Sequence, residues 1–267
     1  MLRLGHIIYS NCFPVHAGLI DRGLPEGITL VEGVPSDLNR RLAAGLVDVA
    51  PSSSIEFARH AQQYRILPGL VIGARGPALS ILLVGRPPET LGGRRVGLTT
   101  ASATSVALLK ILFRIRWKVT PEFFPFDQIR EDPFAAGADA ALFIGDVALR
   151  ADLRPDAEAR IDLGDVWTEE TGLPFAFAVW QASGGDPGEL RRLHAALIDS
   201  RTYGLAHRAD LARRYEATFG LPAALLDRYW ANLVFDLDDS MQEGLKLFYR
   251  FAADAGELPA APPLVWL

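Results

Sequence analysis

Short apolar runs alternate with amphipathic segments from the start of the chain to about residue 180. The apolar runs are bounded by Gly, Pro, Asn and Ser, which is typical of β-strands. Predicted strands cover residues 2–9, 28–32, 47–50, 78–85, 95–99, 138–144 and 174–181. Predicted helices between them cover residues 13–22, 36–44, 53–62 and 102–116. This alternation predicts an α/β fold with a mostly parallel sheet.

From residue 186 onward the hydrophobic pattern is helical. The predicted helices cover residues 187–201, 206–219, 222–233 and 239–253, and Gly220 with Pro222 marks one clear helix stop. The apolar, proline-rich end at 258–267 is predicted to dock on the core in an extended form. The last third of the chain is therefore a helical C-terminal part.

Two long apolar strands, 78–85 and 174–181, stand where one block of α/β units gives way to another. A chain that crosses from one lobe to a second and later returns needs two such crossing strands. The pattern therefore predicts a two-lobed, periplasmic-binding-protein-like (type II) fold. Lobe one would hold residues 1–83 and 180–267, and lobe two residues 84–179. The ligand cleft would lie between them, beyond the carboxyl ends of the strands.

Composition narrows the function classes. The chain has 267 residues, enough to bury a full core, and a net charge of −5, which makes nucleic acid an unexpected partner. Cys12 is the one cysteine, so neither an internal disulfide nor a cysteine-based zinc cluster is expected. With no export signal and no long uncharged apolar stretch in the sequence, we expect a cytoplasmic protein that does not bind a membrane. The oligomeric state and the role of Cys12 stay open.

Polar residues at the strand ends of lobe one are the first candidates for ligand binding. Asn11 follows the first strand, where it could cap the next helix or offer its amide to a ligand. Ser52, Ser53 and Ser54 open a predicted helix, whose N-terminus favours a carboxylate or phosphate. Since capping needs only one serine, we favour an anion site there.

Lobe two repeats this arrangement after strand 95–99, where Ala103, Thr104 and Ser105 open a helix. Two helix N-termini facing each other across a cleft would suit a dicarboxylate, even in an acidic protein. Gly145 allows close approach of a ligand after strand 138–144, and Asp146 could cap the next helix or act in the cleft. Ser80, within a crossing strand, could face the cleft or be a buried hydroxyl.

The histidines lie away from these strand-end loops, so none of His6, His16, His60, His194 and His207 is expected to be catalytic. The sequence contains neither a phosphate-binding loop nor a zinc-protease motif. We therefore expect no metal and no cofactor.

Five segments carry a resemblance to a known family. They are GVPSDLN at 33–39, DVAPSSSIE at 48–56, ASATS at 101–105, ALFIGD at 141–146 and WTEETGLPF at 167–175. In combination they resemble chorismate dehydratases of the futalosine route to menaquinone, over about residues 3–182. A sister enzyme that makes 1,4-dihydroxy-6-naphthoate begins with a Ser-Pro-Cys-Pro-Asn-Asp type segment and uses a cleft histidine. Here the segment is Asn11-Cys12-Phe13-Pro14, which favours the dehydratase.

The resemblance implies a hydro-lyase that converts chorismate, a small dicarboxylate, to 3-[(1-carboxyvinyl)oxy]benzoate without a cofactor. Because the strand-end loops offer no obvious general base, we hypothesise that the substrate's own enolpyruvyl carboxylate takes the C3 proton. Asn11 and Ser80 would hydrogen-bond the substrate, and Asp146 is the next acid/base candidate. The substrate-binding residues would be Ser52, Ser53, Ala103, Thr104, Ser105 and Gly145.

Three other readings stay open. An anion-binding solute-binding protein would share the fold and the cleft. The naphthoate-forming sister enzyme would need a histidine in the cleft. A ligand-sensing regulator would need a DNA-binding segment, and neither end of the sequence resembles one.

Overall fold

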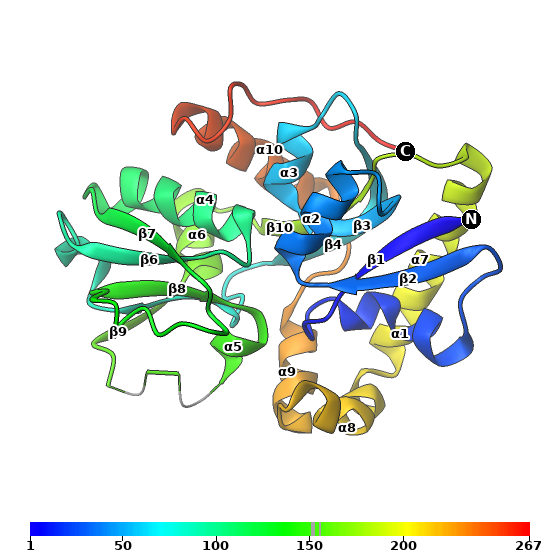
Figure 1. The fold of residues 1–267 in the computed structure, drawn as a ribbon, viewed down its shortest axis with the longest axis horizontal. Coiled ribbons are helices and arrows are strands. Elements are labelled where there is room, and N and C mark those ends of the chain that lie inside the picture. Colours follow the sequence, from blue (N-terminus) through cyan, green and yellow to red (C-terminus); the bar gives the residue numbers. More distant parts are fainter. Residues whose placement is uncertain (151–152, 155) are drawn as a thin grey trace.

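A computed structural model describes residues 1–150, 153–154 and 156–267. The chain forms two five-stranded sheets side by side, each with its own helices, so the molecule has two lobes (Figure 1). All seven predicted strands are present, with bounds that differ from the prediction by three residues or fewer. The predicted two-lobed α/β fold is confirmed.

The first sheet contains the N-terminal strands and one strand that returns from late in the chain. Its order is β2-β1-β3-β10-β4. The bounds are β1 Leu2–Ile7, β2 Ile28–Gly33, β3 Val49–Ser53, β4 Arg65–Ala74 and β10 Phe175–Ala182. Strand β1 runs parallel to β2 and β3, whereas β10 runs antiparallel to β3 and β4.

The second sheet has the same mixed character. Its order is β7-β6-β8-β5-β9. The bounds are β5 Ile81–Gly85, β6 Arg95–Thr99, β7 Glu122–Phe126, β8 Ala140–Ile144 and β9 Ala159–Asp162. Strand β6 is parallel to β7 and β8, but β5 is antiparallel to β8 and β9. In each described sheet only the first strand after a crossover, β10 or β5, runs against its neighbours, so the other four strands point the same way and the prediction of a mostly parallel sheet is confirmed.

The chain changes sheet between β4 and β5 and again between α6 and β10. The two strands predicted to cross lie at these points, but each belongs to one sheet only. The crossovers themselves are the loops 75–80 and 172–174. Sheet membership thus puts both lobe boundaries a few residues earlier than 83 and 179, which fall inside β5 and β10.

The helices follow the predicted pattern most closely at the two ends of the chain. Their bounds are α1 Phe13–Arg22, α2 Pro35–Ala43, α3 Ser54–Arg59, α4 Ala103–Leu112, α5 Gly145–Leu149, α6 Leu163–Thr171, α7 Pro187–Ala206, α8 Arg208–Phe219, α9 Ala223–Asn232 and α10 Asp239–Asp254. Helix α4 continues as a π-helical turn, Phe113–Trp117, and a 3-10 turn covers Pro88–Thr90. In the described part of the chain, no helix has the length and apolar character needed to span a bilayer.

Two glycines allow the C-terminal helices to pack closely on the rest of the protein. A Cβ added at Gly204 in α7 would lie 1.9 Å from the carbonyl oxygen of Pro14, and one at Gly244 in α10 would lie 2.0 Å from that of Pro174. The end of the chain docks in extended form, as predicted: Ile66 N–H donates to Val265 at 2.8 Å, and Leu267 N–H donates to Ile66 at 2.9 Å. The C-terminal part is therefore packed directly against α1, β4 and the second crossover.

Candidate active site

The loops after β1 and β8 meet between the lobes, where they are joined by the first crossover and by α9 (Figure 1). Asn11 follows β1, Asp146 lies in the first turn of α5 after β8, and Ser80 ends the crossover. The predicted strand-end residues of the two lobes are thus brought to one place. Domain junctions of this kind are common places for ligand sites.

Asp146 is held by Ser10 from the opposite lobe. The backbone N–H of Ser10 lies 3.1 Å from both carboxylate oxygens, and the Ser10 hydroxyl donates to Oδ1 at 2.5 Å. Ile144 occupies the N-cap of α5, so Asp146 is not the helix cap that the sequence allowed. Burial raises the pKa of Asp146, and the hydrogen bonds from Ser10 offset only part of that rise.

Asn11 carries an unsatisfied polar atom. Its Oδ1 is buried and has no hydrogen-bond partner among the described residues. The N-cap position of α1 belongs to Cys12, without a side-chain hydrogen bond, so Asn11 does not cap the helix. Leaving a buried amide oxygen unpaired costs roughly 1–3 kcal/mol, and such atoms call for an explanation. A ligand donor would satisfy this oxygen, which favours the ligand-binding alternative.

Ser80 is buried between the crossover and α9. Its hydroxyl lies 2.6 Å from the hydroxyl of Tyr229, and its carbonyl accepts the N–H of Gly145 at 2.9 Å. Gly145 has a φ of +61°, and an added Cβ would lie 3.0 Å from the ring of Tyr9. Gly145 is therefore a neighbour of both Ser80 and Tyr9, and its positive φ and the close Tyr9 ring both disfavour a larger residue there.

The two serines before α3 that were predicted to bind a ligand differ in their hydrogen bonds. Ser52 lies in β3, and its buried hydroxyl donates to Asn39 at 2.6 Å. Ser53 is the N-cap of α3 without a side-chain bond, and its hydroxyl has no partner within the described chain. Of the two serines, only Ser53 therefore has a hydroxyl free for a ligand.

The two predicted helix starts contact each other. The N–H of Ile55, in the first turn of the short α3, donates to Thr104 Oγ1 at 3.2 Å. Ser54 Oγ is also 3.2 Å from the same oxygen. One N–H at the start of α3 is therefore already bound by the opposite lobe, and the anion site expected there stays a prediction.

The start of α4 keeps donors for a ligand. Ser102 is the N-cap and accepts the N–H of Ser105 at 3.2 Å, while the two hydroxyls are 3.0 Å apart. The backbone N–H groups of Ala103 and Thr104 have no acceptor in the described part of the chain. This helix start can therefore bind a carboxylate through its backbone, as predicted for this position.

Two histidines form a buried pair in lobe one. His6 and His16 face each other with their Nδ1 atoms 2.9 Å apart, and Trp180 Nε1–H donates to His16 Nε2 at 3.1 Å. His16 therefore carries its proton on Nδ1 and donates it to His6. Burial lowers the pKa of both rings, to well below the usual value for His16.

Cys12 adds a third potential metal ligand, because one donor atom from each of Cys12, His6 and His16 lies within 4.8 Å of the others. The arrangement does not suit a metal ion. The bond from Trp180 keeps His16 Nδ1 protonated, and burial raises the pKa of the Cys12 thiol to about 12. Metal binding needs a deprotonated thiolate and a free ring nitrogen. The three side chains thus belong to the core.

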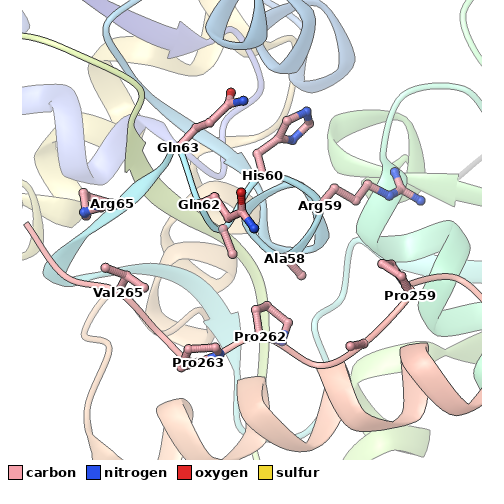
Figure 2. Close-up of a pocket in the computed structure, with 12 residues that line it drawn as sticks. Ala58, Arg59, His60, Gln62, Gln63, Arg65, Pro259, Pro262, Pro263 and Val265 are labelled. Carbon is pink, nitrogen blue, oxygen red and sulfur yellow. The ribbon is translucent and has the colours of Figure 1, made fainter.

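A cavity of about 710 Å³ lies elsewhere, between the end of α3 and the C-terminal segment (Figure 2). Figure 2 shows Arg59, His60 and Gln62 on one side and the prolines of the C-terminal segment on the other. None of the predicted site residues lines it. Reasoning from sequence also missed Tyr9, Ser10 and Tyr229; Ser10 and Tyr9 adjoin Asn11, but nothing in the sequence around Tyr229 indicates that it reaches Ser80.

The two mixed sheets, the double crossover and the site at their junction define a two-lobed α/β protein of the periplasmic-binding-protein type. A crystal structure of a protein from Archaeoglobus fulgidus is similar, with a TM-score of 0.77, 20% identity and coverage of 96% of this chain and 98% of the other. The periplasmic aliphatic sulphonate binding protein of Escherichia coli has a TM-score of 0.65 at 15% identity, over 100% and 92% of the two chains. These likenesses establish the fold.

The chain belongs to the menaquinone biosynthesis family, whose sequence model matches residues 2–254. A protein of Thermus thermophilus named chorismate dehydratase is 32% identical, over 97% of this chain and 96% of its own length. A chorismate dehydratase of Campylobacter jejuni is 35% identical over 65% of this chain and 64% of its own length.

Proposed function

We propose that this chain is a chorismate dehydratase, a hydro-lyase that eliminates water from chorismate to give 3-[(1-carboxyvinyl)oxy]benzoate for menaquinone biosynthesis. The observation that carries the proposal is the buried, unpartnered amide oxygen of Asn11, which follows Ser10 in the chain, the residue that binds Asp146 of the other lobe. The relationship to the Thermus thermophilus enzyme over almost the whole chain supports the same reaction. A cytoplasmic location remains part of the proposal.

Chorismate carries two carboxylates, and the site has separate groups to hold them. The free N–H groups of Ala103 and Thr104 at the start of α4 would hold one carboxylate, assisted by the helix dipole. The free hydroxyl of Ser53 and the backbone around Gly145 would contact the rest of the substrate. Ser52 is left out of this set because its hydroxyl is already bonded to Asn39.

The reaction removes the C4 hydroxyl and the C3 hydrogen, and the ring becomes aromatic. We propose that the enolpyruvyl carboxylate of the substrate takes the C3 proton. The C3–H electron pair then forms the new ring double bond, and the C4 oxygen leaves as hydroxide. Asn11 would accept a hydrogen bond from the C4 hydroxyl through its unpaired oxygen, and Ser80 would donate to the departing oxygen. Positioning of this kind can be worth about 7–11 kcal/mol of the barrier.

Asp146 is the alternative base. Its carboxylate accepts three hydrogen bonds from Ser10, which reduces its basicity, although burial raises its pKa overall. The bonds from Ser10 favour a role in holding the lobes and the electrostatics of the site. The substrate-assisted route therefore remains the preferred proposal.

The test is to incubate the purified chain with chorismate, without added metal or cofactor, and to follow the product by mass and ultraviolet absorbance. Loss of one water with an aromatic spectrum supports the proposal. Unchanged chorismate would contradict it. The two candidate bases are the enolpyruvyl carboxylate of the substrate and Asp146. Full turnover in Asn11→Ala together with no turnover in Asp146→Asn, with chorismate binding intact in both, would assign the base to Asp146.

A second candidate rests on the likeness of the fold to that of the sulphonate-binding protein. An anion-binding protein would bind chorismate tightly and leave it unchanged. Calorimetric titration beside the turnover assay distinguishes this outcome from dehydration.

A further inference from the structure

Two consecutive residues of α9 hold the two loops that form the candidate site. Tyr229 is fully buried, and its hydroxyl lies 2.6 Å from Ser80 Oγ in the crossover. Trp230, the next residue, donates its Nε1–H to the carbonyl of Ser10 at 2.8 Å. Ser10 in turn holds Asp146. One helix thus fixes the position of residues from both lobes.

The direction of the bond between Tyr229 and Ser80 decides what the Ser80 hydroxyl can do. The two buried hydroxyls lie 2.6 Å apart, and each is the other's one hydrogen-bond partner among residues 1–150, 153–154 and 156–267. Burial raises the pKa of Tyr229, so the phenol keeps its proton and can donate. When Tyr229 donates, the Ser80 oxygen is the acceptor and the Ser80 hydrogen is left for a ligand, whereas a Ser80 that donates to Tyr229 has no hydrogen to offer the substrate.

We propose that Tyr229 is a positioning residue for the dehydration: its donated hydrogen bond aims the Ser80 hydroxyl hydrogen at the C4 oxygen that leaves the substrate. The inference rests on the proposed function and adds a residue of the C-terminal helices to the site. Trp230 complements it by fixing the backbone of Ser10, next to Asn11. Tyr229 itself does not contact the substrate.

Tyr229→Phe removes the hydroxyl and keeps the ring. We expect kcat with chorismate to fall about 10-fold, since one neutral hydrogen bond is worth roughly 0.5–1.5 kcal/mol. KM should stay within about twofold, because Tyr229 acts on the transition state through Ser80. Tyr64→Phe is the matched control: Tyr64 is also buried, but its hydroxyl has no partner among the described residues and it lies away from the site.

The decisive measurement repeats Tyr229→Phe in a Ser80→Ala background. If Tyr229 acts through Ser80, its substitution there causes no further loss, so the two effects are not additive. A full additional 10-fold loss, or wild-type kcat in Tyr229→Phe alone, would overturn the inference. Should Tyr229→Phe not fold, 3-fluorotyrosine at position 229 makes a stronger donor of nearly the same size: a changed kcat at constant KM supports the inference, and an unchanged kcat contradicts it. Failure of the proposed function is seen separately, as wild-type protein that does not convert chorismate.

Discussion

The hydroxyl of Ser10 lies 2.5 Å from Asp146 Oδ1, and this hydrogen bond joins the end of β1 in one lobe to the first turn of α5 in the other. A second link runs from Ile55 N–H to Thr104 Oγ1. The lobes are thus connected by two hydrogen bonds to side chains of the second lobe, Asp146 and Thr104.

Asn11→Ala should lower the activity of the protein without lowering its stability. We expect kcat to fall about 100-fold, as for loss of one preorganised polar contact in an active site. The unfolding free energy should stay level or rise, because the variant removes a buried oxygen that has no partner. Chemical denaturation and the chorismate assay on the same preparation test both halves. A clear loss of stability would mean that Asn11 has a structural role instead.

Asp146→Asn should change how stability depends on pH. The pKa of Asp146 is raised in the folded protein by burial, so its stabilising effect is present below the unfolded value, about 3.9, and is lost as pH rises through the folded pKa. The unfolding free energy of the variant minus that of the wild type should therefore be more positive at pH 7 than at pH 4. Urea unfolding at the two pH values measures this difference. An equal difference at both would show that Asp146 has an ordinary pKa.

The buried histidine pair predicts destabilisation by acid. Burial lowers the pKa of His6 and His16, so their contribution to stability is fully present above the unfolded value of about 6.5 and is lost as pH falls from there through the lowered pKa of the folded protein. Each should contribute a slope of about 1.4 kcal/mol per pH unit in that window. His16→Gln should reduce the slope of unfolding free energy against pH by about 1.4 kcal/mol per pH unit.

Gly145→Ala should damage both folding and activity. Residue 145 has a φ of +61°, and the new methyl group would lie 3.0 Å from the ring of Tyr9. We expect a loss of about 1–3 kcal/mol in unfolding free energy and lower turnover. Gly256→Ala is the control, because Gly256 has a φ of +79° with no atom near the added Cβ. It should lose a similar amount of stability while keeping its kcat; equal losses of activity would assign the effect to the fold alone.

Sequence patterns predicted the inner strands well and the outer ones poorly. The missed strands, β4, β7 and β9, all lie at sheet edges. Two of them contain a proline, Pro68 in β4 and Pro125 in β7, which interrupts the pattern but is tolerated where one side of a strand is unpaired. Strand β9 has only four residues, too few for a periodic signal.

For the site, the rule that ligands bind beyond strand ends led to the prediction of Asn11, Ala103, Thr104 and Asp146, which stays a prediction. The rule does not predict which partners these side chains contact. Thr104 pairs with the opposite lobe, and that pairing depends on how the two sheets are placed in space. Tyr229 could not be found either, because it lies 149 residues from Ser80 along the chain.

That separation has a consequence for how the enzyme is made. Ser10, Asn11 and Ser80 leave the ribosome early, and α9 follows only after both sheets have been synthesised. Chains grow at about 5–20 residues per second, so these loops wait roughly 10–40 seconds for the helix that holds them. A nascent or truncated chain that lacks α9 can have both sheets and still lack an organised site. Under the proposed role of Tyr229, such an incomplete chain is expected to have little or no activity on chorismate.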